Sequence, residues 1–516
     1  VVGDTNRMPD GFVFDTSDGR NHRVTAAPGD TGLVARPKEL VVSRNGRFAA
    51  FVTAANGWTD GDTNRTPDVY VRDLVRGTTA LASATDGTDV SLGLVSTQVQ
   101  LSGDGRWAAF RATSASDAGN PGALYLRDLV SRKTTLINAS WRTGTPEFPG
   151  IVRGTSHQLS VDGQTVLFLN ASQWWLHVEG QTNLIPVADV TTSSAASLSP
   201  DGRRVAWLSR GSEEPGLRIR EVASGEERVL LTFPQDTIRD LVFSADGAVL
   251  AYARRSDPAG LPAGNPWQVW ALAIATGSEE LISQTLSGSH GAGDSRAAQI
   301  SADGRFIVFR SAAPGLVPSD EGGMLQVLVR DRYTQKTHRL SETAEGIPGN
   351  WHSTRPEISG DGRFAVFTSF ANNLLPGDGN ALEDVFLASI PQDPAPDSDN
   401  DGLPDGWERD RFGDLTRDGT GDADGDGQSD AEEWQARTDP RDARSRWEVE
   451  AAFERGAPTL RWVGHAGVNY RVERQESLTG SAWAPAGDPQ PGYEGIHSLP
   501  LDDENTGGYY RVIVSQ

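Results

Sequence analysis

Short runs of alternating apolar and polar residues fill the first part of the chain, and a Ser-x-Asp-Gly-Arg motif separates many of them. An Asp-Gly or Asn-Gly pair between two alternating runs is typical of a tight β-hairpin, in which a type I′ turn needs a positive φ at both central residues. Each copy of the motif is therefore predicted to connect two strands. The glycines of its seven copies and close variants are Gly46, Gly105, Gly163, Gly202, Gly247, Gly304 and Gly362.

Two more strands are predicted after each hairpin. A third strand ends in Arg-Asp in several copies, as at 69–73 and 327–331, and a fourth follows, as at 78–81. Four antiparallel strands that recur every 40 to 60 residues or so are typical of propeller blades. We therefore predict a mainly β fold with a β-propeller over residues 1–391, with seven blades as the first choice and eight as the second.

The repeated Ser-x-Asp-Gly-Arg-x-x-x-Phe pattern resembles that of TolB-like β-propellers over roughly residues 1–391. This resemblance implies a fold and no particular function, because the fold serves as scaffold, receptor and enzyme accessory alike. Residues 1–36 look like the third and fourth strands of a blade without its hairpin, and 352–390 show three strands. Either strands from both ends complete one blade, or an upstream segment is missing.

A second recurrence, Gly-Asp-x-Asn-x-x-x-Asp, lies in three loops. Three oxygen-bearing side chains in a short loop could hold a hard cation. The same residue types commonly form Asx-turns and cap backbone amides, which is the interpretation we favour here. The residues are Asp4, Asn6 and Asp10, then Asp62, Asn64 and Asp68, and finally Asp378, Asn380 and Asp384.

A proline-rich linker at 392–396 precedes a strongly acidic segment at 397–442, which holds 16 acidic residues and 5 arginines. Carboxylates recur there with the spacing of a twelve-residue calcium loop, which has glycine at position 6, a carbonyl ligand at 7 and a bidentate glutamate at 12. We predict two Ca²⁺ ions, with a solvated acidic linker as the alternative. The proposed ligands are Asp397, Asp399, Asp401, Leu403, Asp405 and Glu408 in the first loop, and Asp422, Asp424, Asp426, Gln428, Asp430 and Glu433 in the second.

Short helices are predicted after the two loops, at 407–412 and 431–437, with Trp407, Phe412 and Trp434 as a small core. A core of that size would depend on the metal. The segment resembles thrombospondin type 3 and dockerin-like calcium repeats, because it combines Asp-x-Asp-x-Asp-Gly-x-x-Asp-x-x-Glu with an intervening Phe-Gly and a closing Thr-Asp-Pro. That resemblance implies an extracellular, calcium-rigidified spacer, and the dockerin version would imply a protein partner as well.

Residues 443–516 alternate again and predict five or more strands, which suggests a small β-sandwich. The stretches at 469–472 and 509–512 loosely resemble C-terminal modules that follow calcium repeats in secreted bacterial proteins. Trp447, Trp462 and Trp483 could form a carbohydrate platform, but core packing is the commoner role of tryptophan in a strand pattern.

Composition narrows the classes of function. The 516 residues include 47 Lys and Arg against 70 Asp and Glu, and a net charge of −23 disfavours nucleic acid and anionic membranes as partners. Cysteine is absent, which excludes thiolate catalysis, zinc-thiolate sites and disulfides. No apolar run approaches the length of a membrane span, and a chain that begins with Val1 suggests that any leader has been removed or lies outside this sequence.

No catalytic residue and no cofactor site other than calcium is predicted. The histidines have no zinc-binding spacing, and neither a Gly-x-Ser-x-Gly elbow nor a phosphate-binding loop is present. We therefore predict a secreted or cell-surface calcium-binding scaffold, extracellular or periplasmic and bacterial, that presents a propeller face to a protein or carbohydrate. Two alternatives stay open: a propeller-type polysaccharide lyase or hydrolase with its site in the central funnel, and a structural subunit of a surface assembly.

Overall fold

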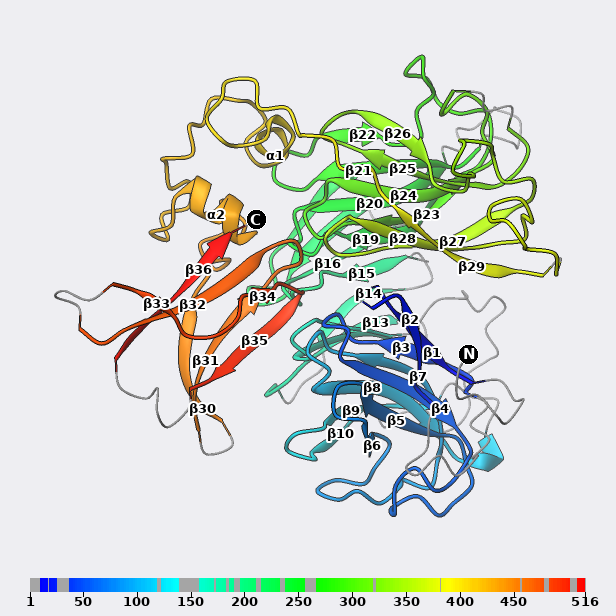
Figure 1. Cartoon of the computed structure of the whole chain (residues 1–516), viewed down its shortest axis with the longest axis vertical. Helices are drawn as coiled ribbons and strands as arrows, with labels where there is room; N and C mark the ends of the chain where they lie inside the picture. Colours follow the sequence, from blue (N-terminus) through cyan, green and yellow to red (C-terminus); the bar gives the residue numbers. More distant parts are fainter. Residues whose placement is uncertain are drawn as a thin grey trace. The chain divides into compact units, whose positions relative to one another are not determined.

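The structure is a computed structural model in which two compact units, Val1–Val187 and Ala188–Gln516, are described separately (Figure 1). The predicted mainly β class is confirmed, since the two α-helices of the described part have 7 residues each. No helix among the described residues has the length and apolar character needed to cross a membrane. The described residues are 10–16, 18–25, 37–117, 122–138, 157–170, 173–181, 185–189, 195–209, 215–232, 237–255, 266–318, 322–380, 382–454, 457–477, 482–501 and 508–515.

The first unit is built from antiparallel sheets whose strands follow the order of the chain. A two-stranded sheet comes first, and three four-stranded sheets follow, the last of which ends at the boundary between the units. The strands are β1 (Phe12–Asp15), β2 (Arg20–Arg23), β3 (Leu40–Val42), β4 (Phe48–Thr53), β5 (Asp68–Asp73), β6 (Thr78–Leu81), β7 (Val95–Leu101), β8 (Trp107–Thr113), β9 (Ala123–Asp128), β10 (Thr134–Asn138), β11 (His157–Leu159), β12 (Thr165–Asn170), β13 (Gln173–Val178) and β14 (Ile185–Asp189). A short 3₁₀ turn spans Ala115–Asp117.

The second unit continues the series with three four-stranded sheets and a three-stranded one. The predicted hairpins and third strands are confirmed, and the last sheet has three strands as predicted. These strands are β15 (Ala196–Leu198), β16 (Arg204–Ser209), β17 (Gly216–Glu221), β18 (Glu227–Thr232), β19 (Thr237–Phe243), β20 (Val249–Arg255), β21 (Gln268–Ala273), β22 (Glu279–Leu281), β23 (Ser295–Ile300), β24 (Phe306–Ser311), β25 (Gln326–Asp331), β26 (Lys336–Arg339), β27 (Ser353–Ile358), β28 (Phe364–Ser369) and β29 (Asp384–Ser389).

The turn of the repeat differs from the predicted type I′ geometry. The motif glycine has a positive φ in every copy, for example 74° at Gly304, but the Asp or Asn before it does not. The N–H of Gly304 donates to the carbonyl of Ser301 at 3.0 Å, which closes a type I turn followed by a left-handed glycine. The buried Ser301 hydroxyl then donates to Asp303 at 2.6 Å and accepts the Phe306 N–H at 2.9 Å. Side-chain bonds therefore replace the second positive φ.

Two separate features of the repeat meet in space. The arginine of the motif pairs with the aspartate that ends the third strand of the same sheet. A short chain of polar contacts thus connects the turn of each such sheet to its third strand. The pairs are Arg47 with Asp73 at 2.6 Å, Arg106 with Asp128 at 2.8 Å, and Arg305 with Asp331 at 2.7 Å.

After the sheets, helices α1 (Asp405–Arg411) and α2 (Asp430–Ala436) precede two sheets that share a core. Trp462 is only 2% exposed in that core, and Trp447 stacks on Tyr470 at 6.1 Å, so both pack as core residues. One sheet holds β30 (Val449–Glu454), β31 (Ala457–Gly464) and β35 (Gly495–Pro500), and the other holds β32 (Asn469–Gln475), β33 (Ala484–Pro485), β34 (Gln490–Pro491) and β36 (Tyr509–Ser515).

The turn geometry predicts that Ser301→Ala destabilises the second unit by about 1 to 2 kcal/mol, because the Phe306 N–H loses its partner in a buried site and Asp303 loses one of its two turn donors. Urea unfolding followed by tryptophan fluorescence measures the change. Ser287→Ala, at an exposed loop serine, is the control and should stay within about 0.5 kcal/mol of the parent. Equal losses in the two variants would contradict the role given to the turn serine.

Candidate metal centre

The two predicted calcium loops have the same internal hydrogen bonds. At position 6 the N–H of Gly402 donates to Asp397 at 3.1 Å, and Gly427 donates to Asp422 at 3.0 Å. At position 7 the N–H of Leu403 donates to Asp401, just as Gln428 donates to Asp426, both at 2.8 Å. Both position-6 glycines have a φ near 95°, which favours glycine strongly. The repeated spacing therefore folds into the same backbone twice.

Carboxylates gather inside each loop. The oxygens of Asp397, Asp399 and Asp401 lie within 4.8 Å of one another, as do those of the second group, which consists of Asp422, Asp424 and Asp426. One oxygen on each of Asp397 and Asp401 is buried and has no hydrogen-bond partner, and the same holds for Asp424 and Asp426. Desolvated carboxylate oxygens without a partner are costly, so these positions call for a cation.

The glutamates at position 12 provide independent support for a cation. Glu408 and Glu433 are fully buried, although each carries a carboxylate. Neither oxygen of Glu408 has a hydrogen-bond partner, while Glu433 receives one bond from the Thr438 hydroxyl at 3.2 Å and leaves its other oxygen unpaired. Two buried acids at the end of two matching loops are what the calcium pattern requires of its bidentate ligand.

Electrostatics point to the same centre. Burial, and then the nearby carboxylates of Asp401 and Asp399, raise the pKa of Glu408 to about 7. Burial followed by Asp424 and Asp426 raises the pKa of Glu433 to about 8. The aspartates of each loop therefore disfavour ionisation of the glutamate that ends the same loop. A divalent cation at the centre would reverse the repulsion and hold the carboxylates ionised.

The remaining predicted ligands divide into two kinds. Asp405 at position 9 accepts the Ser398 N–H at 2.7 Å and pairs with Arg409 at 3.0 Å, and Asp430 accepts the Ala423 N–H and pairs with Arg417, both at 3.1 Å. The residue at position 9 often binds the ion through a water in such loops, which agrees with the direct bonds that Asp405 and Asp430 make to other groups. Leu403 and Gln428 are at the position that offers a carbonyl. The Gln428 side chain instead bonds both backbone groups of Trp447, at 3.0 and 2.9 Å.

The donor set fits a calcium ion. All predicted side-chain ligands are carboxylates, which suit a hard cation, and the large buried oxygen count suits the six to eight ligands that Ca²⁺ accepts. The sequence interpretation of these loops thus agrees with the geometry, although calcium itself stays a proposal. Sequence reasoning did not single out one further group, Asp15, Asp18 and His22, whose ligand atoms also gather in the first unit.

The Gly-Asp-x-Asn-x-x-x-Asp loops differ in having direct bonds between their own side chains, although one oxygen of Asp378 is buried without a partner. Asn64 donates its side-chain amide to Asp68, as Asn380 does to Asp384, both at 3.0 Å. Tyr70 donates its hydroxyl to Asp62. These direct bonds are those expected of the capping interpretation, and a cation would have to displace them. Asp10 accepts the Thr25 hydroxyl at 2.6 Å, and Asp4 and Asn6 lie outside the described residues.

Helix α1 docks on the sheets of its own unit through two buried ion pairs. Asp410 receives two bonds from Arg332, at 2.9 and 2.8 Å, and Arg411 pairs with Asp246 at 2.5 Å. Asp246 belongs to a repeat turn, and its other oxygen accepts the Ser244 hydroxyl. Burial would raise the pKa of Asp246, but Arg411 and the turn donors together hold it below its usual value. The turn motif therefore serves as a docking point for the acidic segment.

Aromatic packing accompanies these pairs. The predicted small core of Trp407, Phe412 and Trp434 is present, with Trp407 to Trp434 ring centroids 5.5 Å apart. Tyr333, from the loop after β25, joins that core and was not predicted. Gly406 lies directly against the Tyr333 ring, where a side chain would clash. The segment is thus attached to the sheets, whereas the resemblance to calcium repeats implied a spacer.

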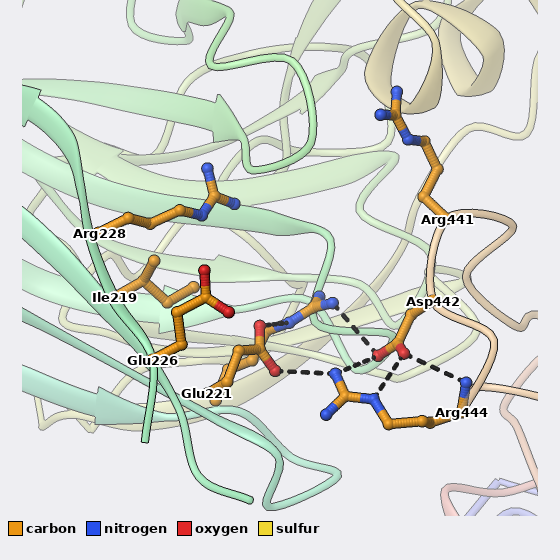
Figure 2. Close-up of a pocket in the computed structure, with 8 residues that line it drawn as sticks. Ile219, Glu221, Glu226, Arg228, Arg441, Asp442 and Arg444 are labelled. Atoms are coloured by element: carbon orange, nitrogen blue, oxygen red, sulfur yellow. Dashed lines mark hydrogen bonds and ion pairs between the residues drawn. The ribbon is translucent and has the colours of Figure 1, made fainter. Parts of the chain in front are cut away.

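The chain after α2 makes a second set of contacts. Arg437 pairs with Asp303 of another repeat turn at 3.5 Å, and Asp439 lies 3.4 Å from Arg204. Figure 2 shows Glu221, Asp442 and Arg444 in an ion-pair network at one side of a pocket of about 220 Å³. Arg204 closes this network, because it pairs with both Glu221 and Asp442. Both loops are therefore followed, within a few residues, by ion pairs to the sheets.

Comparisons with known proteins find only distant similarity, and only to solved structures. No protein-family model and no curated protein matches the chain. Similar solved structures include an oligogalacturonate lyase in complex with manganese, at 14% identity and a TM-score of 0.40 over 75% of this chain and 97% of that one. The β-propeller domain of the Trilobed protease from Pyrococcus furiosus is 11% identical with a TM-score of 0.40, over 69% of this chain and 95% of that one. TolB from Acinetobacter baumannii is 13% identical with a TM-score of 0.31, over 59% of this chain and 70% of that one. These similarities are too low to inform ligand or chemistry.

Removal of one position-12 glutamate tests the metal centre. We expect isothermal titration to find two Ca²⁺ per parent chain and one per chain in either Glu408→Gln or Glu433→Gln, because each variant removes the two oxygens that close one loop. Asp418→Asn, between the loops and bonded only to Thr420 among described residues, is the control and should keep both ions. A parent chain that binds no calcium would refute the site.

The docking contact predicts that Asp246→Asn destabilises the second unit by about 3 to 5 kcal/mol, because it leaves the buried Arg411 charge without its partner. Asp104→Asn is a matched control at the same turn position. Asparagine is compatible with the turn itself, since Asn45 accepts the same Ser43 and Arg47 bonds in the first copy. Calorimetry should show a lower melting temperature for Asp246→Asn alone, and equal shifts would contradict the docking role.

Proposed function

We propose that this chain is a calcium-stabilised binding scaffold of the β-propeller type, which acts outside the cytoplasm and presents its loops to a protein or carbohydrate partner. The main support is the pair of matching loops in which buried glutamates, each with at least one oxygen that has no hydrogen-bond partner, lie beside groups of aspartates. Extracellular calcium is high enough to fill modules of modest affinity constantly, so such loops suit a structural role in that compartment.

The succession of four-stranded antiparallel sheets supports the propeller. Seven blades stay our first choice and eight the second, with a sandwich as the terminal module, since its two sheets share one core. In this arrangement the calcium segment strengthens the sheets to which it is docked. The segment forms ion pairs with three residues of the repeat sheets and turns, namely Arg332, Asp246 and Asp303.

Calcium is assigned a structural role because the proposed ligands lie only a few residues before the residues that pair with the sheets. Glu408 is followed by Asp410 and Arg411, and Glu433 by Arg437. An ion that fixes the start of α1 therefore also fixes the residues that pair with the sheets. Metal binding and docking should be coupled, because ligands that bind only the folded form stabilise it by mass action.

Chelation tests this proposal. We expect EGTA to lower the melting temperature of the second unit, including its sheets, because at free calcium a hundredfold above Kd each ion adds about 2.7 kcal/mol of stability. Differential scanning calorimetry of the full chain with calcium and with EGTA measures the shift. The double variant Glu408→Gln, Glu433→Gln is the control and should melt at one temperature in both buffers. An unchanged parent melting temperature would argue against a structural calcium role.

A further inference from the structure

Three arginines converge on one buried tryptophan in the second unit. The guanidinium carbons of Arg239 and Arg255 each lie 5.2 Å from the Trp267 ring centroid, and that of Arg296 lies at 5.4 Å. Trp267 is 4% exposed, whereas Arg239 is exposed and the other two arginines are half-buried. The guanidinium groups therefore cover the indole and face outward. They come from β19, β20 and β23, in two successive sheets (Figure 1).

The repeat provides an internal comparison for this cluster. The Trp267 carbonyl accepts an N–H at the start of the first strand of the next sheet, and the carbonyls of Pro67 and Leu325 accept the same bond at the corresponding positions. Arg239 and Arg296 each precede a β-bulge, where the corresponding residues of β7 and β27 are Thr97 and Thr354. The frame thus accepts a proline, a leucine or threonines at these positions. The fold does not require the tryptophan and the arginines.

A left-handed residue follows each of the two arginines. Asp240 and Ala297, directly after Arg239 and Arg296, have φ values of 54° and 56°, and Gln98 and Arg355 have 54° and 51° at the corresponding bulges of β7 and β27. The Ala297 N–H donates to the Asp240 carboxylate at 2.8 Å, so the two bulges are joined across the sheets. Bulges redirect side chains and are common beside functional sites. The bulge is therefore part of the repeat frame, and in these two sheets it sets the direction of an arginine in the first strand.

The charges of the cluster are only partly neutralised. Arg296 pairs with Asp294, which also accepts the Trp267 N–H at 2.9 Å. Burial would raise the pKa of Asp294, but the Trp267 N–H and the guanidinium groups of Arg296 and Arg255 hold it below its usual value. Arg239 and Arg255 make no ion pair with any carboxylate among the described residues.

We propose that Arg239, Arg255 and Arg296 form a binding site for an oxyanion, such as the carboxylate or sulfate group of an acidic ligand. Guanidinium groups can donate paired hydrogen bonds to two oxygens of a carboxylate or of a tetrahedral oxyanion, and stacking on Trp267 holds them in place before the ligand arrives. The proposal adds a ligand class to the binding role given above and rests on that role. It does not depend on the calcium loops.

Isothermal titration of the full chain in calcium buffer tests the site. The probes are sodium glucuronate for a carboxylate source and sodium sulfate for a sulfate source, at constant ionic strength, with glucose as the neutral control. We expect the parent to bind at least one of the two anions and not glucose. Arg239→Gln and Arg255→Gln should each weaken that binding about tenfold or more, because a charge-assisted hydrogen bond is lost. Arg228→Gln, an exposed arginine on β18, should bind like the parent.

The outcomes separate this proposal from the calcium proposal. Binding of glucuronate alone supports an acidic sugar or similar carboxylate, and binding of sulfate alone supports a sulfated ligand. Failure of both anions to bind, or equal loss in Arg228→Gln and Arg239→Gln, overturns the site. The calcium stoichiometry is measured on the same samples, so a variant that keeps both ions is folded. Loss of calcium binding with intact anion binding would instead refute only the calcium role.

Discussion

The burial of carboxylates is the constraint on which the second unit depends. An ionised carboxylate taken out of water needs donors or a counter-charge, since its desolvation otherwise costs several kcal/mol. This chain meets the need in three ways. Turn aspartates accept a serine hydroxyl and a backbone N–H, docking aspartates meet arginines, and the buried glutamates of the two loops face positions where a cation would lie. The high acidic content is therefore part of the architecture.

Arginine suits this architecture better than lysine. Arg332 shows why, because its planar group donates to both oxygens of Asp410 and, at 2.9 Å, to the carbonyl of Gly304 at the same time. A lysine ammonium could not match that geometry from one buried position. Only three of the 47 basic residues are lysines, which agrees with so many fixed, partly buried pairs. The same geometry explains why the acidic segment attaches at repeat turns, where one aspartate oxygen stays free after the serine has bound the other.

Sequence periodicity was sufficient for the local structure and insufficient for the contacts. The hairpins, the third strands and the gathering of carboxylates in the two acidic loops follow from spacing alone, because each depends on residues close together in the chain. The type I′ turn was wrong, since a serine side chain one turn away replaces the second left-handed residue. The partners Asp246 of Arg411 and Arg332 of Asp410 lie far away in sequence, and no periodic signal identifies them. The participation of Tyr333 in the small core has the same explanation.

A repeat fold makes such long-range features easier to interpret once coordinates exist. Residues that recur at one structural position, such as the turn serines, are explained by the frame they build. Residues that break the recurrence need another reason. The arginines that dock the acidic segment meet aspartates of the recurring turn, so a common position acquires a partner from outside the repeat. Around Trp267 the backbone follows the repeat, but the tryptophan and arginine side chains belong to two sheets only. The sheets that begin with β7 and β27 have other residues at these positions, and the proposed recognition of a ligand would give the tryptophan and arginines a physical purpose.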